Sequence, residues 1–171
     1  MNPPPYRVTV VCLGNICRSP MAESVLRDRL AAAGLAGRVV VASRGTSDEH
    51  EGQGAHRSTT EVLRRHGHST AYTAHQIGRD DLATSQLVLA LDRANERDLR
   101  GLARTDDERA AIRLLRSFDP AAPAGAEVAD PWGHPVAAFE HVYAQIDAAC
   151  AGLVDWLVAE ALPGWERSRA G

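Results

Sequence analysis

The sequence lacks lysine altogether: all 19 basic residues among its 171 residues are arginines. Alanine is abundant, and the two biases together are typical of a GC-rich genome rather than of a particular function. Acidic residues outnumber basic ones, which gives a formal net charge of -3. Proteins that bind nucleic acid usually carry an excess of basic residues, so we expect no nucleic-acid partner.

Cysteine and long apolar runs are scarce as well. The three cysteines, Cys12, Cys17 and Cys150, are too few for the disulfide framework of a small secreted domain. No apolar run approaches the roughly 20 residues of a membrane span, and residues 1–5 lack the apolar segment of a signal peptide. The seven histidines show no metal-ligand spacing. We therefore predict a cytoplasmic protein with no membrane partner, no metal and no cofactor.

Hydrophobic residues make up 44% of the chain, which is enough for one domain with a full core. We predict that this domain covers residues 7–162, between flexible tails at residues 1–6 and 163–171. Short apolar runs alternate with helical periodicities, which predicts an α/β fold: right-handed crossovers and a parallel sheet with helices on both faces. Strands are predicted at residues 8–13, 38–43, 86–91 and 112–115, and helices at residues 20–33, 57–66, 93–101 and 139–157.

One stretch, residues 8–23 with the sequence VTVVCLGNICRSPMAE, joins a buried strand to a helix. Ser19 and Pro20 suit the N-cap and the first position of that helix. A short loop on a helix N-terminus points backbone N–H groups inward, and the helix dipole adds partial positive charge. Gly14 and Asn15 tolerate the positive φ that a tight loop needs. The stretch therefore predicts a cradle for a tetrahedral dianion.

Two side chains give this cradle its chemistry. Cys12 begins the loop, where the positive field favours its thiolate, and the planar guanidinium of Arg18 can bind two oxygens of an anion. The spacing of these two residues alone is a weak signal. Thiolate attack on phosphorus expels an oxyanion that needs a proton. Asp130, in a proline-rich loop, is the expected general acid, a role typically worth about 10²–10⁴-fold in rate. Asp119, which also precedes a proline, is interpreted as a turn.

The stretch VCLGNICRSPMAE, together with Asp130-Pro131-Trp132, resembles the low-molecular-weight protein tyrosine phosphatases, and the resemblance covers residues 7–158. It implies a single-domain, three-layer sandwich around a four-stranded parallel sheet, with a phosphate-binding loop after the first strand. It also implies hydrolysis of phosphotyrosine in proteins, and of small phosphomonoesters, through a cysteinyl-phosphate that Asp130 helps water to cleave. The implied phosphate-binding residues are Leu13, Gly14, Asn15, Ile16, Cys17 and Arg18.

Supporting roles follow from the same resemblance. Ser19 and Ser43 match residues that hydrogen-bond the loop asparagine and the thiolate. Asp92, after the third strand, matches a residue of the site, although a helix cap explains an aspartate there equally well. Tyr72 stands where the family commonly has a histidine that braces the loop asparagine. A monomer or a weak dimer is expected.

Two residues at the expected mouth of the site depart from the family. Glu49 occupies a position that usually carries an aromatic wall for the phosphotyrosine ring. Trp132 follows the Asp-Pro pair as expected, but Gly133 replaces the second aromatic that often comes next. These departures bear on substrate preference more than on the reaction.

Three other activities stay open from the sequence. Phosphoarginine phosphatases of this scaffold carry threonine where this chain has Ile16, and thioredoxin-coupled arsenate reductases use further cysteines near residues 80–90, where this chain has none. The third alternative is a weakly active phosphate-binding interaction module, which Glu49 and Tyr72 keep open. The intact set of Cys12, Arg18 and Asp130 favours an enzyme.

The two cysteines of the loop also predict redox sensitivity. An accessible thiolate such as Cys12 is the kind that peroxide oxidises to sulfenic acid. Cys17 shares the folded loop and could resolve that species as a disulfide, and the same pair occurs in the resembled family. The alternative is that Cys17 only fills space beneath the loop, as buried thiols often do.

Overall fold

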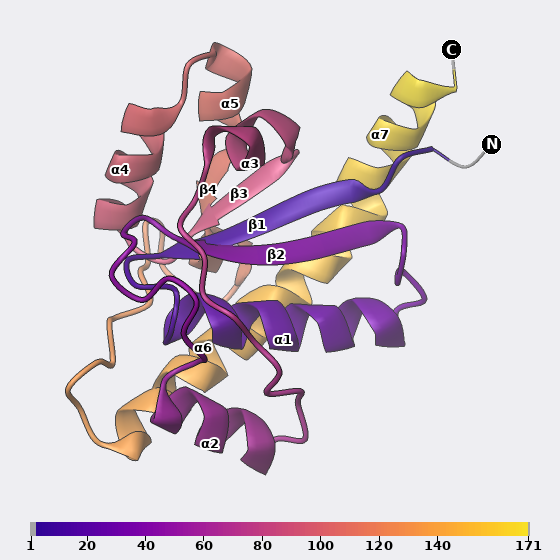
Figure 1. The fold of residues 1–171 in the computed structure, drawn as a ribbon. Helices are drawn as coiled ribbons and strands as arrows, with labels where there is room; N and C mark the ends of the chain where they lie inside the picture. Colours follow the sequence, from indigo (N-terminus) through magenta and orange to yellow (C-terminus); the bar gives the residue numbers. More distant parts are fainter. Residues whose placement is uncertain (1–2, 171) are drawn as a thin grey trace.

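A computed structural model describes residues 3–170 (Figure 1). Its centre is one sheet of four strands in the order β2-β1-β3-β4, and every pairing is parallel. This confirms the predicted α/β fold, a single domain with a four-stranded parallel sheet. The strands are β1 (Tyr6–Cys12), β2 (Val39–Gly45), β3 (Leu87–Ala90) and β4 (Ile112–Leu114).

Helices cover both faces of the sheet, as predicted (Figure 1). Helices α1, α2 and α6 pack together on one face, and α4 with the short helices α3 and α5 lies on the other. The sequence analysis did not predict the two shortest helices, α3 and α5. The helices are α1 (Arg18–Ala32), α2 (Arg57–Arg65), α3 (Arg79–Thr84), α4 (Arg93–Leu102), α5 (Asp106–Ala110), α6 (Val136–Trp156) and α7 (Leu162–Arg169).

The alternation of side chains along β1 builds both halves of the core. Val8, Val10 and Cys12 belong to the larger apolar cluster on the side of α1 and α6, whereas Val11 belongs to the smaller cluster under α4. Because β1 is central, six of its seven residues are buried and five are apolar. The strand was predicted to run to Leu13, but Leu13 lies beyond its end and is 50% exposed.

Gly45 shows how closely the end of β2 approaches the loop after β1. It pairs with Cys12 in the parallel register. A Cβ atom at Gly45 would lie 2.9 Å from the Asn15 Cβ and 2.9 Å from the Leu13 carbonyl oxygen. Only glycine therefore lets β2 end against this loop, and β2 extends two residues further than predicted because the pairing with β1 continues to that point.

The C-terminal segment differs from the prediction. A short π-helical segment, Leu157–Ala161, joins α6 to α7, so the predicted tail from residue 163 is helical through Arg169. The Trp165 ring packs edge-on against Tyr6, with ring centroids 5.9 Å apart, and its Nε1 donates to the Pro4 carbonyl at 3.0 Å. Contacts of Trp165 with Pro4 and Tyr6 thus join parts of the two segments that were expected to be tails. Residues 1–2 and 171 lie outside the described residues.

The run Val136–Arg169 also corrects the expectation about membrane spans. These 34 residues are helical, and by length and composition alone they could cross a membrane. In the fold, however, α6 packs along α1. Its apolar side chains, among them Phe139, Ile146 and Leu153, are fully buried in the larger core cluster. Helix α6, the first part of this run, is therefore a helix of the protein core.

Candidate active site

The loop after β1 is held open by donors that lie outside it. Four of its carbonyl groups accept hydrogen bonds of 2.7–3.0 Å from the segments after β2 and from α2. Carbonyls held outward turn the intervening N–H groups toward the centre of the loop, where they are free to bind an anion. The four contacts are Thr46 N to Cys12 O, Ser47 N to Leu13 O, His56 N to Ile16 O and Thr59 Oγ1 to Cys17 O.

The inner side of the loop is rich in free donors. Within residues 3–170, no backbone–backbone hydrogen bond is donated by the N–H groups of residues 13–17. Helix α1 begins at Arg18, and its N-cap, Cys17, makes no side-chain capping bond. The N–H groups at the positive end of the helix dipole therefore remain available to an anion in the loop.

Asn15 is the strained residue of the loop. Its φ is 58°, and it is almost completely buried. A left-handed conformation costs a non-glycine residue free energy, which tight hydrogen bonding offsets. Its Nδ2 donates to Ser19 Oγ at 2.7 Å and to Ser43 Oγ at 3.2 Å, and its Oδ1 accepts from His75 N at 2.9 Å. Gly14, by contrast, does not have the expected positive φ. A Cβ there would lie 2.9 Å from Cδ2 of His50, so a larger residue would have to displace that side chain.

Ser19 does not cap α1 as predicted. The helix begins at Arg18, two residues earlier than predicted, so Ser19 lies in its first turn with its side chain fully buried. The hydroxyl oxygen accepts from Asn15 and lies 3.1 Å from Cys12 Sγ. Since the amide of Asn15 occupies one lone pair, the hydroxyl proton can go to the sulfur or to the Arg44 carbonyl oxygen, which lies further away at 3.4 Å. Ser19 can therefore stabilise the thiolate of Cys12.

A buried polar cluster supports Asn15 from behind. Ser43 Oγ lies 2.6 Å from Glu23 Oε2 and 2.9 Å from the Tyr72 hydroxyl oxygen. Because the single proton of Ser43 goes to the carboxylate, the Tyr72 hydroxyl donates to Ser43. Burial raises the pKa of Tyr72 well above its usual value, which keeps that proton in place. Tyr72 thus braces Asn15 through Ser43 rather than directly.

Glu23 was missed by the sequence analysis. Its Oε1 also forms an ion pair with Arg27, at 2.6 Å, one turn further along α1. That spacing is typical of an exposed surface pair, so nothing in the local sequence distinguishes Glu23 from an ordinary polar residue. Its contact with Ser43 depends on the packing of α1 against β2.

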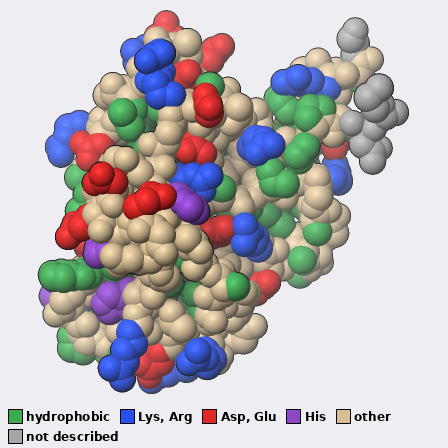
Figure 2. All heavy atoms as spheres, in the orientation of Figure 1, with side chains coloured by type: hydrophobic (Ala, Val, Ile, Leu, Met, Phe, Trp, Pro, Cys, Tyr) green, Lys and Arg blue, Asp and Glu red, His purple; other side chains and the backbone are tan. Residues whose placement is uncertain are grey.

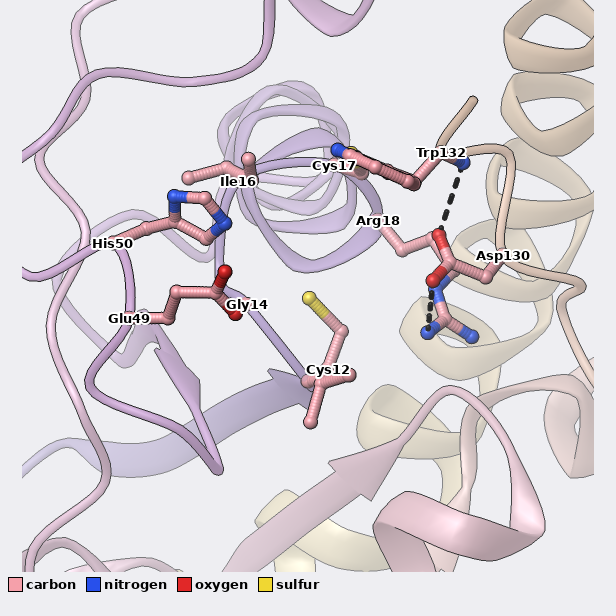
Figure 3. A pocket seen from close by; sticks show the side chains of 10 residues that line it. Cys12, Gly14, Ile16, Cys17, Arg18, Glu49, His50, Asp130 and Trp132 are labelled. Carbon is pink, nitrogen blue, oxygen red and sulfur yellow. Dashed lines mark hydrogen bonds and ion pairs between the residues drawn. The ribbon is translucent and has the colours of Figure 1, made fainter. Parts of the chain in front are cut away.

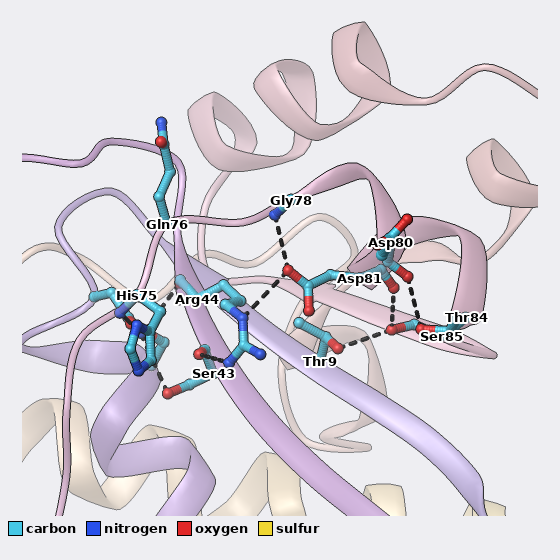
Figure 4. Close-up of polar contacts among 12 residues, drawn as sticks. Thr9, Ser43, Arg44, His75, Gln76, Gly78, Asp80, Asp81, Thr84 and Ser85 are labelled. Atoms are coloured by element: carbon cyan, nitrogen blue, oxygen red, sulfur yellow. Dashed lines mark hydrogen bonds and ion pairs between the residues drawn. The ribbon is translucent and has the colours of Figure 1, made fainter. Parts of the chain in front are cut away.

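The segment that bonds Asn15 is itself anchored by charged contacts (Figure 4). His75 Nδ1 lies 2.7 Å from Glu51 Oε1, and the other Glu51 oxygen accepts from Gln76 N at 2.6 Å. Arg44 Nε donates to Asp81 Oδ2 at 3.2 Å. These contacts hold residues 75–81 against the end of β2, so that the backbone N–H of His75 reaches the Asn15 amide.

Arg18 lies at the base of the site and is 2% exposed. Its Nη1 donates to Asp92 Oδ2 at 2.7 Å and to the Val128 carbonyl at 2.8 Å. Its buried Nε has no hydrogen-bond partner within residues 3–170. One edge of the guanidinium is thus fixed by the protein, and the other keeps a free donor. Asp92 both contacts Arg18 in the site and caps a helix, since its second oxygen accepts from the backbone N–H of Asn95 at the start of α4.

Asp130 reaches the same site from the long loop before α6. Its Oδ1 accepts from Trp132 N at 3.1 Å, and its Oδ2 lies 3.8 Å from Arg18 Nη2. The loop is anchored two residues earlier by buried Val128, whose N–H donates to the Leu91 carbonyl at 2.8 Å. Asp119 forms a turn, as expected, with its Oδ1 accepting from the N–H two residues later at 2.9 Å.

These side chains surround a cavity of about 290 Å³ (Figure 3). Its floor is polar and its rim is partly apolar: Leu13 and Trp132 are among the few large hydrophobic residues that are exposed, 50% and 63% respectively. Glu49 lies on the opposite side from Asp130, next to His50, which the sequence analysis did not single out. The lining residues are Cys12, Leu13, Gly14, Ile16, Cys17, Arg18, Glu49, His50, Asp130 and Trp132.

Cys12 and Cys17 both line this cavity, and neither forms a disulfide. Burial, followed by the neighbouring Cys12 and Asp130, raises the pKa of Cys17 to about 12. Cys17 is therefore a protonated thiol at neutral pH. Burial has the same effect on Cys150, inside α6, and with a smaller contribution from Asp147 raises its pKa to about 12. Among residues 3–170 there is no group of three or more His, Cys, Asp or Glu side chains that could hold a metal ion.

The comparisons with known proteins agree with this geometry. The family described as low molecular weight phosphotyrosine protein phosphatase matches residues 7–162. A low molecular weight protein-tyrosine-phosphatase of Streptomyces coelicolor is 45% identical over 150 residues, 87% of this chain and 92% of that protein. Low molecular weight protein-tyrosine phosphatase A of Mycobacterium tuberculosis is 45% identical over 154 residues, 90% of this chain and 92% of that protein.

A solved structure shares the fold of this chain. The crystal structure of YfkJ from Bacillus subtilis is 34% identical, with a TM-score of 0.85 over 91% of this chain and 96% of that chain. The family match includes the loop from Cys12 to Arg18 as well as Asp130. The chain therefore belongs to the family of low molecular weight phosphotyrosine protein phosphatases.

Proposed function

We propose that the chain hydrolyses phosphotyrosine in proteins, and small aryl phosphates, through a phosphate ester of Cys12. The observation that carries this proposal is the arrangement at the base of the cavity. Outward-held carbonyls free the N–H groups of residues 13–17, and the buried Arg18 Nε is unpaired beside the sulfur of Cys12. Such donors match a phosphate dianion and the charge of its transition state.

The reaction proceeds in two steps. The Cys12 thiolate attacks phosphorus, the P–O bond to the leaving group breaks, and Asp130 gives its proton to the departing oxygen. Asp130, now ionised, takes a proton from a water molecule that attacks phosphorus and breaks the S–P bond. The hydroxyl of Ser19, 3.1 Å from the sulfur, stabilises the thiolate that is released. Inorganic phosphate then leaves the loop.

The rim of the cavity supports an aromatic substrate. Trp132 and Leu13 expose apolar surface at the mouth, while the groups that bind phosphate are buried at the base. A flat ring between these side chains removes apolar area from water and places phosphorus at Cys12. Leu13 thus supplies an apolar contact where the aromatic expected at position 49 is replaced by glutamate.

Ile16 lies in the lining and bears on the phosphoarginine alternative. Its branched alkyl group offers no hydroxyl to a guanidinium, so phosphotyrosine should be preferred over phosphoarginine. We expect Ile16→Thr to narrow the ratio of the two kcat/KM values by about tenfold, the usual effect of one hydrogen bond to a charged group. Hydrolysis of phenyl phosphate, phosphotyrosine peptide and phosphoarginine, measured side by side, checks this. Preference for phosphoarginine by the wild type would contradict the proposed substrate class.

The remaining alternatives lack structural support among the described residues. Arsenate reduction coupled to thioredoxin needs a relay of further cysteines, but the third cysteine, Cys150, is fully buried in α6. An inert binding module is opposed by the intact set of nucleophile, arginine and acid in one cavity. We further propose that the enzyme acts in the cytoplasm as a monomer or weak dimer, on a phosphoprotein or a small phosphomonoester, without a cofactor.

We also propose that peroxide inactivates the enzyme reversibly. Peroxide converts the Cys12 thiolate to sulfenic acid, with loss of hydroxide, and the sulfur of Cys17 then displaces water to form a disulfide. The elevated pKa of Cys17 makes its thiolate rare at neutral pH. We therefore expect disulfide formation to accelerate as pH rises, because each pH unit increases the thiolate fraction about tenfold below the pKa.

Recovery after oxidation tests this role of Cys17. The enzyme is treated with peroxide and then with a thiol reductant, and the activity regained is compared between wild type, Cys17→Ser and Cys150→Ser. Wild type and Cys150→Ser should regain most of their activity, whereas Cys17→Ser should regain much less because its sulfenic acid proceeds to irreversible acids. Equal recovery in all three proteins would leave Cys17 as a packing residue.

A further inference from the structure

Glu49 is an uncompensated carboxylate at the mouth of the phosphate site. Its side chain is exposed and lines the same cavity as Arg18, and Figure 3 shows its carboxylate pointing into the pocket opposite Asp130. Among residues 3–170 it takes part in no ion pair and no side-chain hydrogen bond. Figure 2 shows acidic side chains and histidines gathered on this side of the molecule.

Its neighbours do not neutralise it. Glu51, two residues further on, is bonded to His75 and to the backbone of Gln76. His50 lies beside Glu49 in the lining, but its Nδ1 is 3.0 Å from Gln53 Oε1 and is thus turned to a neutral partner. The guanidinium of Arg18 is already engaged by Asp92, and its free donor faces the phosphate position at the base.

A bound phosphate places a second negative charge in the cavity with the Glu49 carboxylate, which is unfavourable unless the substrate also supplies a cation. The phosphate dianion and Glu49 would share a cavity of about 290 Å³, and like charges at such separation repel one another. That volume is at the small end of ligand pockets and suits a single phosphorylated side chain. A cationic group of the substrate at the rim, where Glu49 is exposed, would offset this repulsion.

We infer that Glu49 selects phosphotyrosine that is flanked in its own sequence by arginine or lysine. The inference rests on the proposed function and adds the class of substrate. The base of the cavity fixes the phosphate, the apolar rim fixes the ring, and Glu49 attracts a cationic side chain one or two residues away. An acidic neighbour at the same place is repelled. A family member with an apolar aromatic at this position has no charge with which to make that distinction.

The test compares three phosphotyrosine peptides that differ only in the residues next to phosphotyrosine: arginine, alanine or glutamate. The kcat/KM of each is measured for wild type, Glu49→Gln and Asp48→Asn. Glutamine keeps the shape of the side chain and removes its charge. Asp48 is the matched control, because it is an exposed carboxylate next in sequence that does not line the cavity.

For wild type and Asp48→Asn we expect the arginine peptide to exceed the glutamate peptide by about fivefold or more at low salt, the effect of an exposed ion pair. Glu49→Gln should reduce this ratio to near one, and about 0.5 M salt should reduce the wild-type ratio in the same way. Equal ratios in wild type and Glu49→Gln would overturn the inference while leaving the proposed function intact. Hydrolysis of phenyl phosphate without hydrolysis of any peptide would overturn the inference and also the proposed activity on phosphotyrosine in proteins.

Discussion

Replacement of Cys12 by serine is expected to abolish the hydrolysis of aryl phosphates while phosphate binding is retained. A serine hydroxyl is protonated at neutral pH and is a far weaker nucleophile than a thiolate, so the loss in kcat should reach about 10⁴-fold or more. The donors that hold phosphate are unchanged, because they are the N–H groups of residues 13–17 and the guanidinium of Arg18. Calorimetric titration with inorganic phosphate measures the second part of this prediction.

Arg18→Ala provides the matched comparison. This variant removes the buried guanidinium and leaves Asp92 without its 2.7 Å partner at the base of the cavity. Both hydrolysis and phosphate binding should then be lost, since the unpaired carboxylate of Asp92 also repels the anion. Circular dichroism establishes that each variant is folded. Phosphate binding by Arg18→Ala at wild-type strength, with both variants folded, would refute the assigned role of the guanidinium.

Asp130→Asn is expected to reduce kcat/KM by about 10²–10⁴-fold for substrates whose leaving group has a high pKa, such as alkyl phosphates. An amide cannot donate the proton that such a leaving group needs. For p-nitrophenyl phosphate the loss should be much smaller, because nitrophenolate leaves without a proton. The quantity to compare is kcat/KM, since it reports only the steps up to departure of the leaving group.

The dependence of log(kcat/KM) on the pKa of the leaving group, measured across a series of aryl and alkyl phosphates, tests whether Asp130 is the general acid. In the variant, log(kcat/KM) should fall steeply as the pKa of the leaving group rises, whereas in wild type it should be nearly flat. Asp119→Asn is the control, because Asp119 also precedes a proline but forms a turn outside the cavity. A uniform loss across the series in Asp130→Asn would remove Asp130 from the acid role and leave it as a partner of Arg18.

The catalytic loop could be predicted because its chemistry is local in the sequence. Cys12 and Arg18 belong to one strand–loop–helix unit, and an apolar run followed by Ser-Pro is enough to place that unit. Asp130, more than 100 residues away, is a candidate from its long proline-rich loop, and the family resemblance supports that assignment. The parallel sheet followed from the alternation of apolar runs with helical periodicities, which its two-sided burial requires.

The residues that escaped prediction depend on contacts between distant segments. Glu23 forms an i,i+4 pair on α1 that resembles any surface pair, and only the packing against β2 brings it to Ser43. Ser19 matched a helix cap, but the helix begins earlier and its hydroxyl turns to Cys12. Helix α7 contains proline and glycine near its start, which favour a chain break locally. Packing of Trp165 on Tyr6 overrides that preference.

The most direct test of the mechanism is to trap the covalent intermediate. Wild-type enzyme is mixed with p-nitrophenyl phosphate, quenched in acid within milliseconds and cleaved with trypsin. Cleavage after Arg7 and Arg18 releases residues 8–18, which contain both cysteines of the loop, so fragment spectra must distinguish them. We predict one phosphoryl group on the sulfur of Cys12 and none on Cys17. A phosphoryl group on any other residue, or a fully active enzyme that never carries one, would contradict nucleophilic catalysis by Cys12.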